Sequence, residues 1–482
     1  MGLADLSAPD PVARPEPGSF RDPANRVFYL GGQVLRGLGP QAADDWRALS
    51  ATEFFPPLLA AGKVCGSEPA EPTVAAAGGG EWAMVLRHER IPFVSYPYEW
   101  SFTMLRDAAL LHLDILRAAV PAGFITKDGS AYNLQWRGVE PVFIDVGSFE
   151  RARDGEPWAG YRQFCQTLLY PLMLQAHLGL DFQPWLRARI DGVETAQMRR
   201  LFSGARRFYP GVFKHVHMHD ALQSRYAAAG TGAVREQLRD AGFSQQLLLT
   251  TLRALEKLVR RLDWSPPASH WSDYHETCSY SDEDRQRKQV FVDSVLAQAG
   301  APRLVLDLGA NDGTYARLAA RHAQYVVAVE SEPAVVDQLY QKLRAEGERR
   351  ILPLVMDLAD PSNGGGWRGI ERASFARRAE ADMVLALALI HHLAIGRNVP
   401  LAEVLDWLFG LLPAGPRARL VVEFVHPEDP MAQRLLANKP ADLFPDYRRE
   451  EFERLLGQRC RIVRREQLPS GTRTLYVGVP HD

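Results

Sequence analysis

The chain lacks the cysteine pattern of a disulfide-bonded or metal-binding protein and the leader of a secreted one. Its four cysteines lie far apart with no metal-ligand spacing, so we expect isolated reduced thiols in a cytoplasmic protein. The N-terminal stretch MGLADLSAPDPVARPEPGS has neither a basic region nor an apolar one, so we expect no secretory signal. Its proline, alanine and acidic residues predict a disordered lead-in over residues 1–20. The cysteines are Cys65, Cys165, Cys278 and Cys460.

Long apolar runs and an excess of one charge are also missing. The most apolar run, Met383 to Ile390, is far shorter than the roughly 20 residues of a membrane span, so we expect a buried strand there. Lys plus Arg total 56 and Asp plus Glu total 58, which leaves no overall basic surface for nucleic acid. The apolar share of 46% is typical of a globular protein, and the length predicts two to four domains.

The C-terminal half alternates apolar strand patterns with helical ones. After a helix at 282–299, strands are expected at 303–308, 325–330, 351–355, 382–388 and 418–424. The end of the chain, RCRIVRREQLPSGTRTLYVGV, predicts two antiparallel strands at a sheet edge. This alternation predicts an α/β fold, with a Rossmann-like doubly wound sheet that closes on an antiparallel terminal hairpin.

The segment VLDLGANDGTY at 305–315 carries the most specific chemistry. Gly309 and Gly313 allow the backbone to turn sharply and to approach a ligand, and Asn311 readily adopts the left-handed conformation. The spacing is Asp-x-Gly-x-Asn-x-Gly, whereas a dinucleotide pyrophosphate calls for Gly-x-Gly-x-x-Gly. The pattern therefore favours S-adenosylmethionine (SAM) over NAD as the bound cofactor.

Acidic residues end three successive strands of the predicted sheet. Asp307 ends the first and is placed to reach the amino group of the cofactor or an ordered water. Glu330 ends the second, where a ribose diol needs a carboxylate, and Asp357 ends the third, where it can accept from the adenine amino group. The alternative for Glu330 and Asp357 is that they are helix caps or loop carboxylates.

With these motifs the segment 271–482 resembles the class I SAM-dependent methyltransferases. The resemblance implies methyl transfer from SAM. It also implies that the glycine loop and the strand-end acids bind the cofactor. Tyr280, with Trp271 and Tyr274, precedes the sheet, and these rings would either form a lid over SAM or pack in the core.

Methyl transfer from a sulfonium needs an oriented acceptor and a group that removes its proton. His391 and His392 follow the fourth strand, where such enzymes often place residues that face the substrate, and a neutral imidazole suits a hydroxyl acceptor. The alternative is that one imidazole packs in the core and the other faces solvent. Glu423, at the end of the fifth strand, and His426 are further candidates for the acceptor pocket.

The N-terminal half is expected to form a separate α+β domain over 21–264, before a linker at SPPASH. It would consist of a small lobe at about 21–98 and a helical lobe at about 99–264. The small lobe begins with a hairpin at VFYLGGQVLR and continues with helical sequence over 41–61. A buried helix is expected at 100–119.

Residues 127–147, KDGSAYNLQWRGVEPVFIDVG, resemble the catalytic and metal loops of protein kinases and aminoglycoside phosphotransferases. That resemblance implies a kinase-like domain with Asp128 as the base and with Asn133 and Asp145 as ligands of magnesium in a Mg-ATP complex. Three features depart from it. Thr126-Lys127 replaces the usual histidine, and no convincing glycine-rich phosphate loop precedes residue 90. No strand supplies an obvious phosphate-binding lysine, and Arg36 is a poor candidate for that role.

Three interpretations of the N-terminal motif remain open. The domain is an active phosphotransferase, a kinase-like module that is inactive or repurposed for binding, or a chance match in which Asp128 and Asn133 shape a turn. The combined layout resembles bacterial nodulation-associated or glycan-modifying methyltransferases. It implies a small-molecule or glycan acceptor, more readily methylated on oxygen than on carbon. A non-enzymatic module that holds SAM structurally is the remaining rival. A nucleic-acid substrate is disfavoured because no Asn-Pro-Pro-Tyr-type motif follows the fourth strand.

Overall fold

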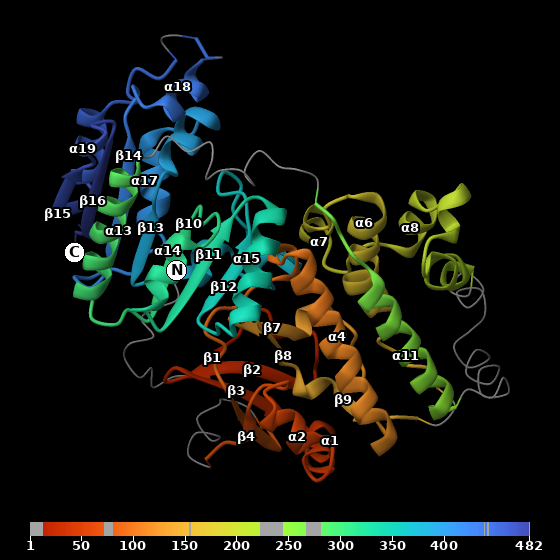
Figure 1. The fold of residues 1–482 in the computed structure, drawn as a ribbon. Coiled ribbons are helices and arrows are strands. Elements are labelled where there is room, and N and C mark those ends of the chain that lie inside the picture. Colours follow the sequence, from red (N-terminus) through yellow and green to blue (C-terminus); the bar gives the residue numbers. More distant parts are fainter. Residues whose placement is uncertain are drawn as a thin grey trace. The chain divides into compact units, whose positions relative to one another are not determined.

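The computed structural model describes residues 13–71, 81–153, 156–221, 244–266, 281–437, 439–440 and 443–481 (Figure 1). The chain forms two compact units, and each is described by itself. The first unit comprises Met1–Trp136, Pro141–Ser265 and Gly365–Arg372, and the second comprises Arg137–Glu140, Pro266–Gly364 and Ala373–Asp482. In the described ranges, no helix is both long and apolar enough to cross a membrane.

The first unit begins with a five-stranded antiparallel sheet in the order β1-β2-β3-β5-β4. The expected hairpin is present, and Gly31 and Gly32 form its turn with φ of 53° and 79°, as a tight hairpin turn requires. The lead-in was predicted too long, because Arg14 pairs with Tyr29 in this sheet. The strands are β1 (Arg14–Pro15), β2 (Asn25–Leu30), β3 (Gln33–Leu38), β4 (Ser67–Pro69) and β5 (Met84–His88).

The helical sequence after this hairpin forms two helices, where one stretch over 41–61 was predicted. Helix α1 covers Pro40–Ser50 and α2 covers Phe55–Ala60. Pro56 and Pro57 lie in the first turn of α2, and proline is tolerated there because those N–H groups have no partner inside a helix. A continuous helix would put both prolines in its interior, so the chain ends α1 and begins again.

A long buried helix and four short strands follow. Helix α4 (Phe102–Ala119) begins at Ser101, whose hydroxyl accepts from the Met104 amide, and its inward positions are apolar as predicted. Strand β6 (Phe124–Thr126) pairs with β9 (Phe149–Arg151), and β7 (Leu134–Arg137) pairs with β8 (Glu140–Phe143). These two pairings bring the turns around Asp128 and Asp145 together.

The rest of the first unit is helical, as its periodicity predicts. Helix α11 packs along α4, and two π-helical turns, Cys165–Leu169 and Phe213–Met218, interrupt the α-helical geometry. The α-helices are α5 (Tyr161–Phe164), α6 (Tyr170–Leu178), α7 (Gln183–Ala188), α8 (Thr195–Leu201) and α11 (Gln245–Arg261).

The second unit contains a seven-stranded sheet in the order β12-β11-β10-β13-β14-β16-β15. The first five of these strands are parallel, and β16 lies antiparallel between β14 and β15. The strands are β10 (Leu304–Leu308), β11 (Tyr325–Glu330), β12 (Ile351–Val355), β13 (Met383–Ala386), β14 (Arg419–Val425), β15 (Cys460–Gln467) and β16 (Arg473–Pro480). The predicted doubly wound sheet with a terminal hairpin is therefore confirmed.

Helices connect these strands and cover the sheet (Figure 1). The central strands are buried along their whole length, which explains why they are continuous apolar runs rather than alternating ones. The sheet order reverses between β10 and β13, and at such a switch point the carboxyl ends of the strands leave a crevice for a ligand. The helices are α13 (Asp282–Gln298), α14 (Thr314–Ala320), α15 (Pro333–Glu346), α16 (Phe375–Ala379), α17 (Leu401–Phe409), α18 (Pro430–Leu436) and α19 (Arg449–Gly457).

Candidate functional site

A cavity of about 570 Å³ opens at this switch point in the second unit. Its volume falls within the range of small-molecule sites, roughly 300–1,000 Å³. Its wall contains apolar side chains, several carboxylates and three cations. The polar members are Arg285, Lys288, Gln289, Asp307, Asn311, Asp312, Thr314, Tyr315, Glu330, Ser331, Glu332, Asp357, His392 and Arg397.

The glycine loop after β10 forms the part of the wall nearest the strand ends. Gly309, Asn311 and Gly313 have φ of 78°, 47° and 80°, so all three take the left-handed conformation expected from their residue types. A side chain at Gly313 would meet the Leu339 side chain at 2.6 Å, whereas the space at Gly309 is open except for Leu389 at 3.7 Å. Glycine at 313 therefore lets the loop pack against Leu339. Glycine at 309 leaves space for a ligand to approach the backbone.

Asp312 closes the end of this loop at the start of α14. Its Oδ1 accepts from the amide of Thr314 at 3.1 Å and from the Thr314 hydroxyl at 2.8 Å. A carboxylate in this position accepts from the first amide of the helix and adds a negative charge there. The site that a pyrophosphate would take at the N-terminus of a helix is therefore occupied by an anion, which agrees with the departure from a dinucleotide motif.

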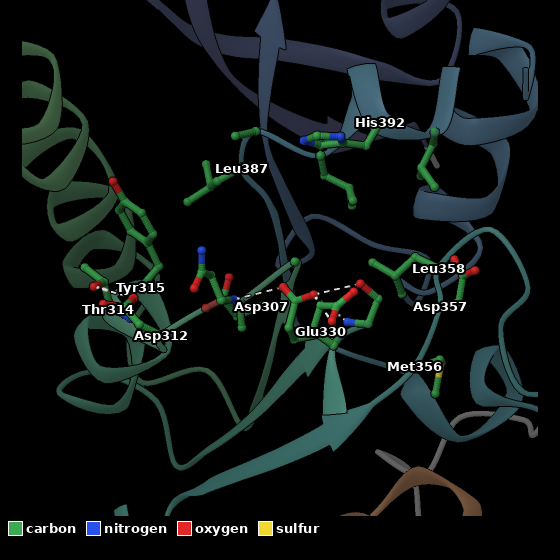
Figure 2. Close-up of a pocket in the computed structure, with 18 of the residues that line it drawn as sticks. Asp307, Asp312, Thr314, Tyr315, Glu330, Met356, Asp357, Leu358, Leu387 and His392 are labelled. Carbon is green, nitrogen blue, oxygen red and sulfur yellow. Dashed lines mark hydrogen bonds between the residues drawn. The ribbon is translucent and has the colours of Figure 1, made fainter. Parts of the chain in front are cut away.

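Glu330 lies at the floor of the cavity, at the end of β11 (Figure 2). One carboxylate oxygen accepts from the amide of Asn311 at 3.2 Å, and the other accepts from the amide and hydroxyl of Ser331 at 2.6 and 2.8 Å. The side chain therefore joins the glycine loop to the next strand. Its role is not that of a simple helix cap, because the Asn311 amide comes from a different element.

Asp307 is buried at the end of β10 and also faces the cavity (Figure 2). Its Oδ2 has no hydrogen-bond partner among the described residues. Burial raises the pKa of this carboxyl to about 7, and the nearby charge of Lys288 partly offsets the rise. A buried carboxylate oxygen without a partner is suited to a cationic or hydrogen-bond-donating ligand.

Asp357 follows β12 on the opposite side of the cavity. Its Oδ1 accepts from the amide of Ala359 at 2.9 Å, and its Oδ2 forms an ion pair with Arg397. The Asp357 side chain is 40% exposed and that of Arg397 is 58% exposed. A ligand that reaches Asp357 would therefore share the carboxylate with a solvent-exposed arginine.

The structure separates the two histidines that follow β13. His392 lines the cavity, whereas His391 is 1% exposed and lies behind it. Their rings lie with centroids 4.1 Å apart. Burial, helped by the charge of Arg473, lowers the pKa of His392 to about 4, and burial also places the pKa of His391 well below its ordinary value. Both imidazoles are thus neutral at pH 7.

Two other predicted acceptor residues do not line the cavity. Glu423 is fully buried, and His426 is bonded through its Nε2 to the Thr474 hydroxyl at 2.9 Å. His391, Glu423 and His426 are not among the lining residues of this cavity, so their expected place beside the acceptor stays a prediction. Glu423 instead forms buried ion pairs with Lys288 and Arg473. Of the predicted residues after the fourth and fifth strands, His392 alone remains on the wall.

A buried chain of ion pairs was missed by the sequence interpretation. Lys288 Nζ lies 2.7 Å from Glu423 Oε2, and Glu423 Oε1 lies 3.3 Å from Arg473 Nη1. Arg473 Nε in turn lies 2.8 Å from Asp429 Oδ2. Charged residues inside the apolar strands RLVVEFV and RTLYVGVP were the available indication, because a buried charge needs a partner.

The aromatic residues proposed as a lid, Trp271, Tyr274 and Tyr280, lie outside the described residues. Within the described range, Tyr315 of α14 is the aromatic residue that lines the cavity (Figure 2). The Lys288 ammonium lies 4.8 Å from the centroid of the Tyr315 ring. This distance permits a cation–π interaction.

The segment 127–147, for which a kinase-like role was predicted, is held together by hydrogen bonds between its two ends. The amide of Asp128 donates to the Ser148 hydroxyl at 3.1 Å, and the amide of Ile144 donates to the carbonyl of Asn133 at 2.9 Å. Burial, followed by the charge of Asp145, raises the pKa of Asp128. The Asn133 Nδ2 has no hydrogen-bond partner among the described residues.

Arg36 already engages the motif from strand β3. Its Nη1 donates to Asp145 Oδ1 at 2.8 Å and to Asn25 Oδ1 at 2.7 Å, and its Nε lies 3.2 Å from His88 Nε2. Lys127 is paired separately with Asp22 at 2.8 Å. Across the described residues, no cluster of three His, Cys, Asp or Glu side chains is arranged to hold a metal ion. Asn133 and Asp145 would supply two ligands, which is within what magnesium accepts from a protein.

The second unit is a Rossmann-like α/β domain with a cavity at the switch point of its sheet. No protein-family model matches the chain. The chain belongs to the family of the nodulation protein NoeA. It is 34% identical to NoeA of Rhizobium meliloti (strain 1021) over 477 residues, which is 96% of this chain and 97% of that protein.

Solved structures resemble less than half of the chain. The N-methyltransferase NodS from Bradyrhizobium japonicum WM9 in complex with S-adenosyl-L-homocysteine (SAH) is 13% identical, covers 44% of this chain and 100% of its own, and has a TM-score of 0.32. A SAM-dependent methyltransferase from Aquifex aeolicus is 16% identical over 44% of this chain and 100% of its own, with a TM-score of 0.30. Magnesium protoporphyrin IX methyltransferase from Synechocystis PCC 6803 with bound SAM is 18% identical. It covers 46% of this chain and 89% of its own, with a TM-score of 0.28.

Proposed function

We propose that the second unit is a SAM-dependent methyltransferase. The observation that carries the proposal is the position of Glu330, whose carboxylate accepts from the Asn311 amide and faces the cavity at the end of β11. A carboxylate at the second strand end of a doubly wound sheet is suited to a ribose diol. The left-handed loop at 309–313 lets the backbone approach the same ligand.

The remaining strand-end acids match the other parts of such a cofactor. Asp307 has a free buried oxygen for the amino group of the methionine part, and Asp357 is placed for the adenine amino group. Asp312 at the start of α14 disfavours a pyrophosphate, which separates this cofactor from NAD. SAM, when bound, supplies an electrophilic methyl group, so the protein must mainly position the acceptor and manage its proton.

His392 is the residue proposed to orient the acceptor. Its imidazole is neutral at pH 7, since its pKa is about 4, and it can therefore accept a hydrogen bond from a hydroxyl. A base with so low a pKa is a weak proton acceptor, because general base catalysis works best with a pKa near the working pH. His392 would thus serve mainly to orient the acceptor hydroxyl toward the methyl donor. It would contribute less as a general base that takes up the proton.

The acceptor class is proposed to be a small molecule or glycan hydroxyl. With the cofactor bound, a cavity of about 570 Å³ would leave room for only a part of the acceptor. A larger acceptor would then enter by one end, as a glycan terminus does.

A transfer assay with methyl-labelled SAM tests this proposal. The full chain would be incubated with labelled SAM and a panel of oligosaccharides and small alcohols, with Glu330→Ala as the inactive comparison. We expect label in a product made only by the native chain, with the methyl on oxygen by NMR. A chain that binds SAM and labels nothing in the panel or in a cell extract would favour the non-enzymatic rival.

For the first unit we propose a kinase-like module that binds a ligand without transferring a phosphoryl group. The observation that favours this reading over an active phosphotransferase is the 2.8 Å ion pair between Arg36 and Asp145. Arg36 neutralises the carboxylate that magnesium would need, and Asn133 offers no charge in its place. Titration with magnesium-ATP and an assay of ATP turnover test this directly. Turnover that disappears in Asp145→Ala would show an active phosphotransferase instead.

A further inference from the structure

One stretch of the first unit exposes several large apolar side chains close together. Eleven such side chains are exposed among the described residues, and four of them fall within residues 208–218. They are Phe208, which is 70% exposed, Phe213 at 55%, Met218 at 47% and Tyr209 at 40%. Single apolar residues scattered over a surface need no explanation, whereas a group of them marks a site of interaction.

The same stretch is basic. Residues 195–219 contain five arginine and lysine residues and no aspartate or glutamate. One of these cations, Arg199, forms an ion pair with Asp220 at 3.0 Å. The other four are exposed, and they are Arg200, Arg206, Arg207 and Lys214. Because the chain as a whole is nearly neutral, this stretch is a local concentration of positive charge.

Buried residues hold the backbone of this stretch in place. Phe202 and Val212 are both 0% exposed and lie on either side of the exposed loop between them. His217 Nε2 lies 3.0 Å from the Phe202 carbonyl oxygen. The short helical turn Gly204–Phe208 packs against the π-helical turn Phe213–Met218. The exposed side chains of the two turns therefore belong to one continuous surface.

The π-helical turn has an inner side and an outer side. His215 and Val216 are buried, whereas Phe213, Lys214 and Met218 are exposed. Phe213 and Met218 are five residues apart, which is the spacing of π-helical hydrogen bonds, so their side chains lie on the same side of the turn. Lys214 therefore shares the outer side with two apolar side chains.

We propose that this basic aromatic surface binds a membrane that contains anionic lipid. Its members are Arg200, Arg206, Arg207, Phe208, Tyr209, Phe213, Lys214 and Met218. Aromatic rings enter the boundary between lipid headgroups and acyl chains, and arginine and lysine are attracted to the anionic headgroups. The proposed membrane contact belongs to the first unit and is independent of methyl transfer by the second.

A nucleic acid would also attract these cations, but the apolar side chains fit it less well. Single-stranded nucleic acids stack their bases on exposed aromatic faces. The Arg207 guanidinium already lies over one face of the Phe208 ring, 4.7 Å from its centroid. Met218, on the outer side of the π-helical turn, offers no ring to a base. Exposed apolar side chains among cations, with no acidic residue between them, favour a lipid interface.

Vesicle flotation of the full chain tests this proposal. One set of vesicles contains phosphatidylcholine alone, and the other contains phosphatidylcholine and phosphatidylglycerol in equal parts. Two double variants separate the contributions. Arg206→Gln with Arg207→Gln removes charge, and Phe208→Ser with Phe213→Ser removes the apolar side chains that would enter the membrane.

The matched controls lie on other elements of the same unit. Arg87→Gln with Arg90→Gln removes two exposed cations at and after β5. Leu247→Ser removes an apolar side chain of α11 that is 47% exposed. All the altered side chains are exposed, so each variant is expected to fold, and circular dichroism checks this.

We expect the native chain to float with the anionic vesicles, to stay largely unbound with the neutral ones, and to be released as the salt concentration rises. Each double variant of the surface should weaken binding to the anionic vesicles by about tenfold or more. The controls should change this binding by about twofold or less.

Three results would overturn the proposal. A native chain that floats with neither kind of vesicle makes no such membrane contact. Vesicle binding that both double variants of the surface retain in full would belong to another part of the chain. A native chain that binds a single-stranded oligonucleotide and no vesicle, with the oligonucleotide binding lost in Arg206→Gln with Arg207→Gln, would have a nucleic-acid surface instead.

Discussion

The amide of Asn311 donates a hydrogen bond to Glu330 Oε2 at 3.2 Å, which ties the glycine loop after β10 to the end of β11. Through this contact one carboxylate supports the conformation of the loop and faces the ligand cavity at the same time. The loop and Glu330, the proposed ribose-binding acid, are therefore expected to act as one unit. A change at either should affect the cofactor affinity and the order of the loop together.

Replacement of Glu330 by alanine should weaken SAM binding by about tenfold or more, since it removes a charged acceptor for the ribose and frees the Asn311 amide. Titration calorimetry measures the loss. The matched control is Glu346→Ala, which removes a carboxylate that pairs with Arg317 at the surface and should leave the affinity unchanged. Equal affinities for Glu330→Ala and the native chain would contradict a ribose contact.

Binding of the cofactor should become weaker as the pH falls from 8 to 6. The pKa of Asp307 in the folded chain is about 7, and the ammonium of the ligand favours the ionised carboxylate. Protonation of Asp307 on the acid side of 7 therefore opposes binding, by up to roughly tenfold per pH unit below the pKa. His392 stays neutral over this range because its pKa is about 4.

Asp307→Asn provides the comparison for this pH dependence. The variant cannot ionise, so its affinity for SAM should be lower at pH 8 and nearly constant between pH 6 and 8. The prediction would be contradicted if the SAM affinity of the native chain were constant between pH 6 and 8. It would also be contradicted if Asp307→Asn still lost affinity as the pH falls, because another group would then be titrating.

Gly313→Ala should destabilise the second unit. The φ of 80° disfavours any side chain, and the new Cβ would lie 2.6 Å from the Leu339 side chain, so a loss of about 1–3 kcal/mol is expected in denaturant unfolding. Gly457→Ala is the matched control. It lies at the end of α19, where a Cβ meets nothing within 4 Å, and it should change the unfolding free energy by less than about 0.5 kcal/mol.

Arg36→Met should lower the stability of the first unit by about 1–3 kcal/mol, because it leaves Asp145 and Asn25 without their shared donor. The control Arg47→Met breaks a surface pair with Asp44, in which both side chains are more than half exposed, and should cost less than about 1 kcal/mol. Denaturant unfolding monitored by fluorescence would record both. Equal losses of unfolding free energy in the two variants would contradict a stabilising role of Arg36 in the motif.

The strand pattern and the glycine loop could be predicted because both depend on local sequence. The apolar runs of β10 and β13 and the residue types at Gly309, Asn311 and Gly313 specify them directly. The long-range contacts could not be predicted in the same way. Lys288 and Glu423 lie far apart in the chain and meet only in the folded domain. The burial of His391 is likewise visible only in the folded domain.

In the first unit, too, the elements set by local sequence could be predicted and the long-range contacts could not. The hairpin at Gly31-Gly32 and the helix α4 follow from local sequence, whereas the break between α1 and α2 depends on Pro56 and Pro57, which the helical periodicity obscured. Arg36 was noted as a poor stand-in for a phosphate-binding lysine. Arg36 lies in β3 and Asp145 follows β8, so their ion pair forms only when the chain is folded.

The central claim is that the loop at 309–313 binds SAM, and titration of SAM into the full chain and into Gly309→Arg tests it most directly. The open space at Gly309 faces the cavity, so an arginine there would be strained by the φ of 78° and would fill the site with a bulky cation. We predict saturable binding to the native chain and none that is measurable in the variant, with circular dichroism confirming that the variant is folded. Absence of binding to the native chain, or unchanged affinity in Gly309→Arg, would contradict the account.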